Sequence, residues 1–328
     1  MTMKQHITYF DFLRGVAILM VLGIHTYVDG DFTSLDGTLK ILFRQILNCA
    51  VPVFLALSAF FLGRKTFENR DSVLFFWKKQ IPKVYIPCMV WSLPLLVILI
   101  LEGGNILELI CKMIVCGLSV YYFIALIIQY YLLLPFLQKH LKRNLIVAII
   151  SSVIAVLTVT YLLYIKGVTI PIIVYAGLFP VWFVFYMLGV YYSRKERGYS
   201  LLSVWIVVIF GLILEFVETY YLNTRFSGGV GIKLSSFIYS YGIILLVLHP
   251  RIEASFCKNK LSSFIVYIGK ISFGIYLSHC YIISIVIRVV TFESWLMKFF
   301  VVSLLTIIMI TLARRILPNK IKHYIGFT

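Results

Sequence analysis

Long apolar runs separated by short polar connections dominate this chain. A helix that crosses a bilayer needs about 20 mostly apolar residues, because the hydrocarbon core is about 30 Å thick and a helix rises about 1.5 Å per residue. The pattern predicts ten membrane-spanning helices, at residues 9–28, 42–62, 83–101, 119–138, 145–165, 170–192, 201–222, 234–249, 264–287 and 296–316. A further apolar stretch, 105–117, is short and contains Glu108 and Lys112, so we interpret it as an interfacial or re-entrant piece.

The composition excludes a soluble globular enzyme. Of the 328 residues, 61% are hydrophobic and only 13% are charged, whereas soluble domains are about 25% charged. The apolar residues form unbroken runs rather than short alternating segments, which also excludes a transmembrane β-barrel. We therefore expect an all-α, polytopic membrane protein, and the short connections predict a single membrane domain over residues 1–328.

The net charge of +17 is explained by orientation in the membrane. With the N-terminus inside, 22 of the 30 Lys and Arg residues fall on the inner side and seven on the outer side, with Arg44 inside a helix. Excess positive charge marks cytoplasmic loops, so both termini are predicted to be cytoplasmic. No nucleic-acid partner is expected, and neither a metal site nor a permanently bound cofactor.

The first apolar run carries three ionisable residues, Asp11, Arg14 and His25. Charged or titratable groups at membrane depth are costly, so each is a functional candidate. Asp11 and Arg14 are three residues apart and can pair. Arg14 and His25 are eleven apart, which returns a helix to within about 20° of the same direction after about 16 Å. The alternative is that Arg14 is an interfacial anchor and His25 a polar plug bonded to a neighbouring helix.

Other polar residues extend the candidate site. Lys79 and Lys83 lie four apart at the predicted entrance of the third span, where ammonium groups and free backbone N–H groups could hold phosphates. An ordinary basic cytoplasmic loop is the alternative. The remaining candidates for substrate binding lie within or beside apolar runs and are Ser58, Tyr122, Gln129, Tyr130, Ser272, Tyr276 and His279.

Five motifs in this order resemble the acyltransferase 3 family of integral membrane acyltransferases. They are Arg14-x10-His25 preceded by Asp-Phe-Leu, Ser58-Ala-Phe-Phe-Leu, Lys79-x3-Lys83 followed by Pro87, Tyr-Phe-Ile…Gln129-Tyr130-Tyr131…Leu-Pro, and Ser272-Phe-Gly-Ile-Tyr276-Leu-x-His279. The chain departs from the family pattern at Ala59, usually Gly, at Lys79 and Lys83, usually Arg, and at Val120 and Tyr122, usually His and Trp.

The resemblance implies transfer of an acyl group, usually acetyl from cytoplasmic acetyl-CoA, to a hydroxyl of a carbohydrate or another cell-envelope molecule. It implies a multi-pass protein of the bacterial inner membrane, with acyl-CoA as co-substrate and Arg14 and His25 as the essential pair. Our hypothesis is that His25 is the general base, with its neutral form favoured by burial, and that Arg14, oriented by Asp11, binds the donor or the developing negative charge. An acyl-histidine relay fits equally well.

Competing interpretations are an exporter of polysaccharide or lipid-linked sugar and an inactive acyltransferase fold that serves as a sensor or scaffold. The acceptor, the acyl group and the oligomeric state stay open.

Overall fold

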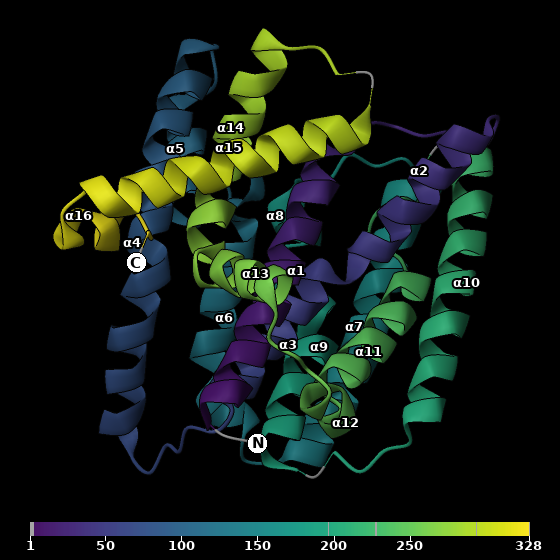
Figure 1. The fold of residues 1–328 in the computed structure, drawn as a ribbon, viewed down its shortest axis with the longest axis vertical. Coiled ribbons are helices and arrows are strands. Elements are labelled where there is room, and N and C mark those ends of the chain that lie inside the picture. Colours follow the sequence, from purple (N-terminus) through teal and green to yellow (C-terminus); the bar gives the residue numbers. More distant parts are fainter. Residues whose placement is uncertain (1–2, 196, 227, 293, 328) are drawn as a thin grey trace.

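The computed structural model is a bundle of α-helices, and it describes residues 3–195, 197–226, 228–292 and 294–327 (Figure 1). These residues contain no strand. In chain order the helices are α1 (Met3–Thr26), α2 (Leu35–Ile46), α3 (Ala50–Leu62), α4 (Arg70–Leu101), α5 (Ile106–Ile114), α6 (Tyr122–Leu137), α7 (Leu141–Thr160), α8 (Ile172–Tyr175), α9 (Phe179–Arg194), α10 (Leu201–Phe226), α11 (Leu234–Leu248), α12 (Pro250–Ala254), α13 (Lys260–Lys270), α14 (Ser272–Val289), α15 (Trp295–Ile316) and α16 (Asn319–Tyr324).

The expected all-α membrane fold is confirmed. Eight helical segments of the described residues are long and apolar enough to cross a bilayer, namely Thr8–Thr26, Leu35–Leu62, Arg70–Leu101, Ile106–Leu137, Leu141–Ile165, Leu201–Phe226, Ser272–Val289 and Trp295–Ile316. The other two predicted spans fall on the shorter helices α9 and α11. The total of ten spans and the side on which the termini lie stay predictions.

Burial divides the helices into a central group and a lipid-facing group. Helices α1, α3 and α9 lie in the middle of the bundle, and α4 and α10 lie on opposite outer sides (Figure 1). On α9, ten consecutive residues from Val181 to Val190 are buried. On α10, by contrast, Ile206, Ile209 and Ile213 are each more than half exposed. Large apolar side chains exposed along a whole helix indicate contact with lipid rather than water.

Two predicted spans are broken, which corrects their boundaries. The run 264–287 divides at Ile271 into α13 and α14, so the apolar helix long enough to span begins at Ser272. The run 170–192 divides at residues 176–178 into α8 and α9. A break in a helix leaves backbone N–H and C=O groups without their helical partners, and at membrane depth these groups need other polar partners. Gln129 supplies them at the second break, because its amide donates to the carbonyl of Gly177 (2.7 Å) and accepts from the N–H of Phe179 (3.1 Å).

Helix α4 begins earlier than the sequence pattern predicts. It starts at Arg70 behind a capping box formed by Asn69 and Ser72, so Lys79 and Lys83 lie within the helix rather than at its entrance. Most backbone N–H groups at this point are bonded inside the helix and are not free to hold phosphate. The prediction of a helix entrance at Lys79 was therefore wrong, and only the two ammonium groups remain available.

The stretch 105–117 forms helix α5, which packs against α4. Leu107 is 74% exposed, and Glu108 pairs with Lys112 at 2.5 Å on the surface of the helix. The chain then turns through Cys116 and Ser119, both of which have positive φ angles (56° and 51°), and continues into α6. This turn delivers Val120 and Tyr122 to the interior of the bundle.

Helix α13 lies directly against α1, and two glycines permit the contact. A β-carbon on Gly269 would lie 1.8 Å from the carbonyl oxygen of Asp11, and one on Gly15 would lie 2.1 Å from the carbonyl oxygen of Ile265. Any side chain at either position would force the two helices apart. This packing fixes the part of α1 that carries Asp11 and Arg14.

Candidate active site

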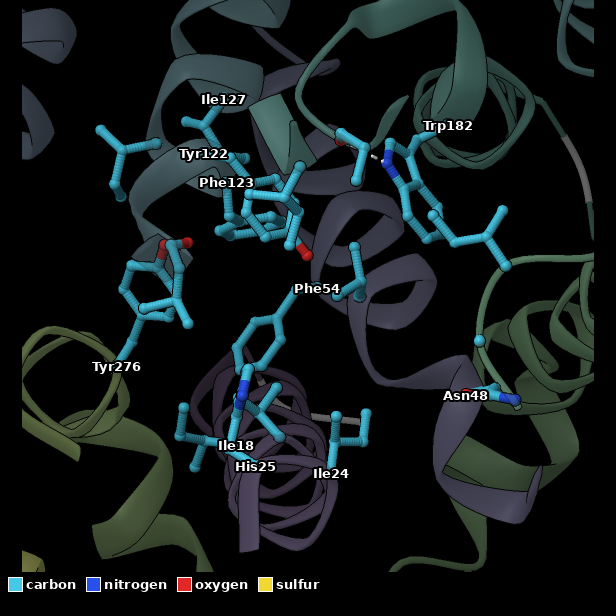
Figure 2. Close-up of a pocket in the computed structure, with 18 of the residues that line it drawn as sticks. Ile18, Ile24, His25, Asn48, Phe54, Tyr122, Phe123, Ile127, Trp182 and Tyr276 are labelled. Carbon is cyan, nitrogen blue, oxygen red and sulfur yellow. Dashed lines mark hydrogen bonds between the residues drawn. The ribbon is translucent and has the colours of Figure 1, made fainter. Parts of the chain in front are cut away.

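A cavity of about 400 Å³ runs through the bundle, within the usual range of about 300–1,000 Å³ for small-molecule sites. Figure 2 shows Tyr276 and Asn48 at opposite edges of this cavity, with His25 and Phe54 between them. Its polar lining residues are Arg14, His25, Arg44, Asn48, Ser58, Tyr122, Tyr131, Tyr164, Tyr175, Ser236, Ser240, Ser272 and Tyr276. The rest of the lining is apolar. We call the part of the cavity lined by Arg14 the Arg14 end and the part lined by Arg44 the Arg44 end.

Arg14 and His25 point to the same side of α1, as their spacing predicts, because both line this cavity. The predicted ion pair is also present, with Arg14 Nη1 at 3.2 Å from Asp11 Oδ1. The guanidinium lies over the ring of Phe61, 5.1 Å from its centroid. Asp11 itself is buried and does not line the cavity, so it acts by orienting Arg14.

His25 occupies the last turn of α1, where its ring faces the cavity with no hydrogen bond to a described residue. The ring of His279 lies behind it, with 5.0 Å between the two centroids. His279 is fully buried, and its Nδ1 lies 2.7 Å from the carbonyl oxygen of Tyr276. A carbonyl only accepts, so we assign the proton of a neutral His279 ring to Nδ1. His25 is therefore the imidazole that is available to a ligand.

Four of the predicted substrate-binding residues line the cavity, namely Ser58, Tyr122, Ser272 and Tyr276. Tyr276 donates to the carbonyl of Val120 (2.6 Å) and so ties α14 to the turn before α6. Gln129, Tyr130 and His279 do not line it. Tyr130 donates to the carbonyl of Phe179 (2.7 Å) and stacks on Tyr186, which makes it a support of the break before α9.

Lys79 and Lys83 do not line the cavity, but Trp77 on the same helix donates to the carbonyl of Tyr131, which does line it. Both lysines are exposed on α4, and Val84, the next residue along the chain, lines the cavity. Burial, and then the charges of Lys79 and Lys83, hold the pKa of Lys65 below its usual value. Lys65, Lys79 and Lys83 thus form a group of neighbouring ammonium ions, which we call the lysine cluster. Among the residues the structure describes, no carboxylate lies within 4.0 Å of these three ammonium groups. Such a group of like charges favours the binding of a polyanion.

Several polar residues of the lining were not among the predicted site residues, and two of them, Arg44 and Asn48, carry charge or an amide into the cavity. Arg44 was recognisable, because it is a charged residue within a predicted span, the same feature that singled out Arg14. Asn48 was not, because its place depends on the 3₁₀ turn Leu47–Cys49 between α2 and α3. In the part of the chain that the structure describes, no group of three or more His, Cys, Asp or Glu side chains could hold a metal ion.

The fold and this cavity define a multi-pass membrane protein that holds a guanidinium and an imidazole in one internal space. A family model described as an acyltransferase domain, acyltransferase 3, matches residues 7–315, and the chain belongs to this family of membrane acyltransferases. It is 27% identical, over 263 residues, to the Bacillus subtilis (strain 168) protein named "Putative membrane-bound acyltransferase YfiQ". That match covers 74% of this chain and 70% of the relative. No solved structure matches the chain.

Proposed function

We propose that this membrane acyltransferase transfers an acyl group, acetyl in the simplest case, from cytoplasmic acyl-CoA to a hydroxyl of a carbohydrate of the bacterial cell envelope. The observation that carries the proposal is the common cavity of Arg14 and His25. We assign the protein to the bacterial inner membrane, where the lysine cluster would face the cytoplasmic pool of acyl-CoA. Family membership favours acyl transfer over the alternative of export without chemistry.

The dimensions of CoA support this arrangement. Its phosphates would bind at the lysine cluster, and its pantetheine arm would enter past Arg14. That arm has about 12 bonds between phosphate and sulfur, equivalent to about four extended residues or roughly 14 Å. The rise along α1 from Arg14 to His25 is about 16 Å. The arm is comparable in length with this rise, so the thioester would come close to His25 when the phosphate lies level with Arg14.

His25 would act as the general base. Its free ring nitrogen takes the proton of the acceptor hydroxyl while the oxygen attacks the thioester carbonyl. The tetrahedral intermediate then collapses, the carbon–sulfur bond breaks, and CoA leaves as a thiol after protonation by His25. Arg14, held by Asp11, stabilises negative charge on the donor or on the oxyanion.

The proposal is tested by acetyl transfer with the purified protein in nanodiscs. Acetyl-CoA labelled in the acetyl group is supplied with a cell-envelope carbohydrate fraction, and both free CoA thiol and carbohydrate-bound label are measured. We expect label in the carbohydrate and an equal amount of released thiol. Thiol release without acceptor labelling would contradict the carbohydrate acceptor, and no turnover of acetyl-CoA would contradict the donor.

We expect the double variant Lys79→Ala, Lys83→Ala to raise the KM for acetyl-CoA about 10-fold, with little change in kcat. Two ammonium groups that attract phosphates from outside the cavity contribute to binding but touch no reacting atom, and a factor of ten corresponds to about 1.4 kcal/mol. The effect should shrink at high salt, because exposed charges are screened. The matched control is Lys142→Ala, an exposed lysine in the first turn of α7. An unchanged KM in the double variant would remove the lysine cluster from the donor site.

A further inference from the structure

The Arg44 end of the cavity contains a buried network of charged and amide side chains. Arg44 Nη1 donates to Asn48 Oδ1, and Asn48 Nδ2 donates to Glu215 Oε1 at 2.6 Å. Lys233 Nζ lies 3.3 Å from the same Glu215 oxygen and 2.7 Å from Gln45 Oε1. Glu215, Lys233 and Gln45 are fully buried. We call these five residues the Arg44 network.

The charges of this network do not balance. It contains two cations, Arg44 and Lys233, and a single carboxylate, Glu215, which forms its ion pair with Lys233. Glu218, one helical turn further along α10, accepts from the backbone N–H of Ser235 (2.9 Å) and interacts electrostatically with Lys233, not with Arg44. Among the described residues, no carboxylate oxygen lies within 4.0 Å of the Arg44 guanidinium. A cation at membrane depth without such a partner is costly unless a ligand supplies the missing negative charge.

Arg44 also has unused hydrogen-bond donors that face an open space. A guanidinium carries five N–H groups, and Arg44 makes a single hydrogen bond to the described residues, through Nη1. One face lies toward the ring of Tyr27, 6.0 Å from its centroid. The side chain lines the cavity together with Asn48 and Tyr164. A planar fork of free donors matches the two oxygens of a carboxylate or a phosphate.

We propose that Arg44, positioned by Asn48, forms an anion subsite that binds a carboxylate or phosphate group carried by the acceptor. The acceptor is then an acidic carbohydrate, with a uronic acid or a sugar phosphate beside the hydroxyl that receives the acyl group. This inference rests on the proposed function, because His25 lines the same cavity and would act on the neighbouring hydroxyl. Glu215, paired with Lys233, accepts from Asn48 and so holds the amide that positions Arg44.

The test measures ligand binding in the absence of acyl-CoA. Purified protein in nanodiscs is titrated calorimetrically, each time to 50 mM, with methyl β-D-glucuronide, glucose 1-phosphate or the neutral methyl β-D-glucoside. We expect at least one anionic probe to bind about 10-fold more tightly than the neutral one. The probe that does so distinguishes a carboxylate subsite from a phosphate subsite. Arg44→Gln should abolish the preference, and Arg44→Lys should restore part of it, because charge is kept but the fork is lost.

Arg225→Gln is the matched control, because it removes an exposed arginine from the last turn of α10. Equal binding of all three probes to the unmodified protein, or no binding by any of them, would overturn the proposal, and neither result depends on the folding of a variant. An undiminished preference in Arg44→Gln would overturn it as well. Failure of the protein to turn over acetyl-CoA would contradict the proposed function while leaving the anion subsite standing.

Discussion

Replacing His25 with alanine should lower the kcat for acyl transfer by about 10²–10⁴-fold, the range that a positioned general base contributes. The KM for acetyl-CoA should stay nearly unchanged, because Arg14 and the lysine cluster keep their positions. His25 is half-buried at the cavity wall and holds no helix by a hydrogen bond to a described residue, so its removal should cost little stability. Release of CoA thiol and labelling of the acceptor measure both constants.

The matched control for this prediction is His140→Ala, which removes an exposed histidine just before α7. A His25→Ala protein that is folded in nanodiscs and transfers acetyl at the unmodified rate would refute the catalytic role. His279→Ala helps to separate chemistry from packing. Its loss removes the ring behind His25 and should lower kcat through misplacement of His25, and it should also lower the thermal unfolding temperature.

The acyl-histidine relay is separated from general-base catalysis by a single-turnover experiment. Without acceptor, a relay leaves the labelled acetyl group on His25, where it survives separation of the protein from acetyl-CoA. General-base catalysis leaves no label on the protein under the same conditions. We expect no label, because an acyl-imidazole beside the second ring of His279, 5.0 Å away between centroids, would crowd a closely packed helix pair.

The sequence predicted the parts of the fold that follow from a local repeat. Helices α7, α10 and α15 coincide with their predicted spans to within about five residues at most ends, because 20 apolar residues in a row have few alternatives to a spanning helix. The placement of Arg14 and His25 on one cavity wall followed in the same way, from the 100° turn of each helical residue. Both predictions need only short-range geometry.

The breaks in helices could not be predicted, because their causes lie elsewhere in the chain. The gap before α9 is stabilised by Gln129 and Tyr130 of α6, about 50 residues away. The break at Ile271 accompanies the close contact of Gly269 with Asp11, more than 250 residues apart. Conversely, the predicted start of the third span at residue 83 falls inside α4, which begins at Arg70 and continues through three prolines. A pattern along one segment carries no information about such distant partners.

The same limit applies to the site. Ser58, Tyr122 and Tyr276 were predicted from motifs and line the cavity, whereas Gln129 and Tyr130 belong to equally recognisable motifs and support the fold instead. A motif identifies residues that a family needs, and it does not separate residues that touch a substrate from residues that position the backbone. Only their hydrogen-bond partners make that distinction.

Replacing Lys233 with methionine should lower the free energy of unfolding by about 3–5 kcal/mol, the usual cost of removing one partner from a buried ion pair. Both Lys233 and Glu215 are fully buried, and Oε2 of Glu215 already has no hydrogen-bond partner among the described residues. The variant therefore leaves a carboxylate whose remaining interaction is the amide of Asn48.

The double variant Lys233→Met, Glu215→Met distinguishes a buried charge from a lost contact. If the cost comes from the uncompensated carboxylate, removing that carboxylate as well should restore most of the stability, because apolar side chains of similar volume are well tolerated in place of a buried pair. Lys40→Met is the control, since Lys40 pairs with the exposed Asp36 at 2.6 Å and its loss should cost less than about 1 kcal/mol. Unfolding by sodium dodecyl sulfate in mixed micelles measures all three variants. A double variant as unstable as Lys233→Met alone would mean that Lys233 stabilises the protein by packing and not by its charge.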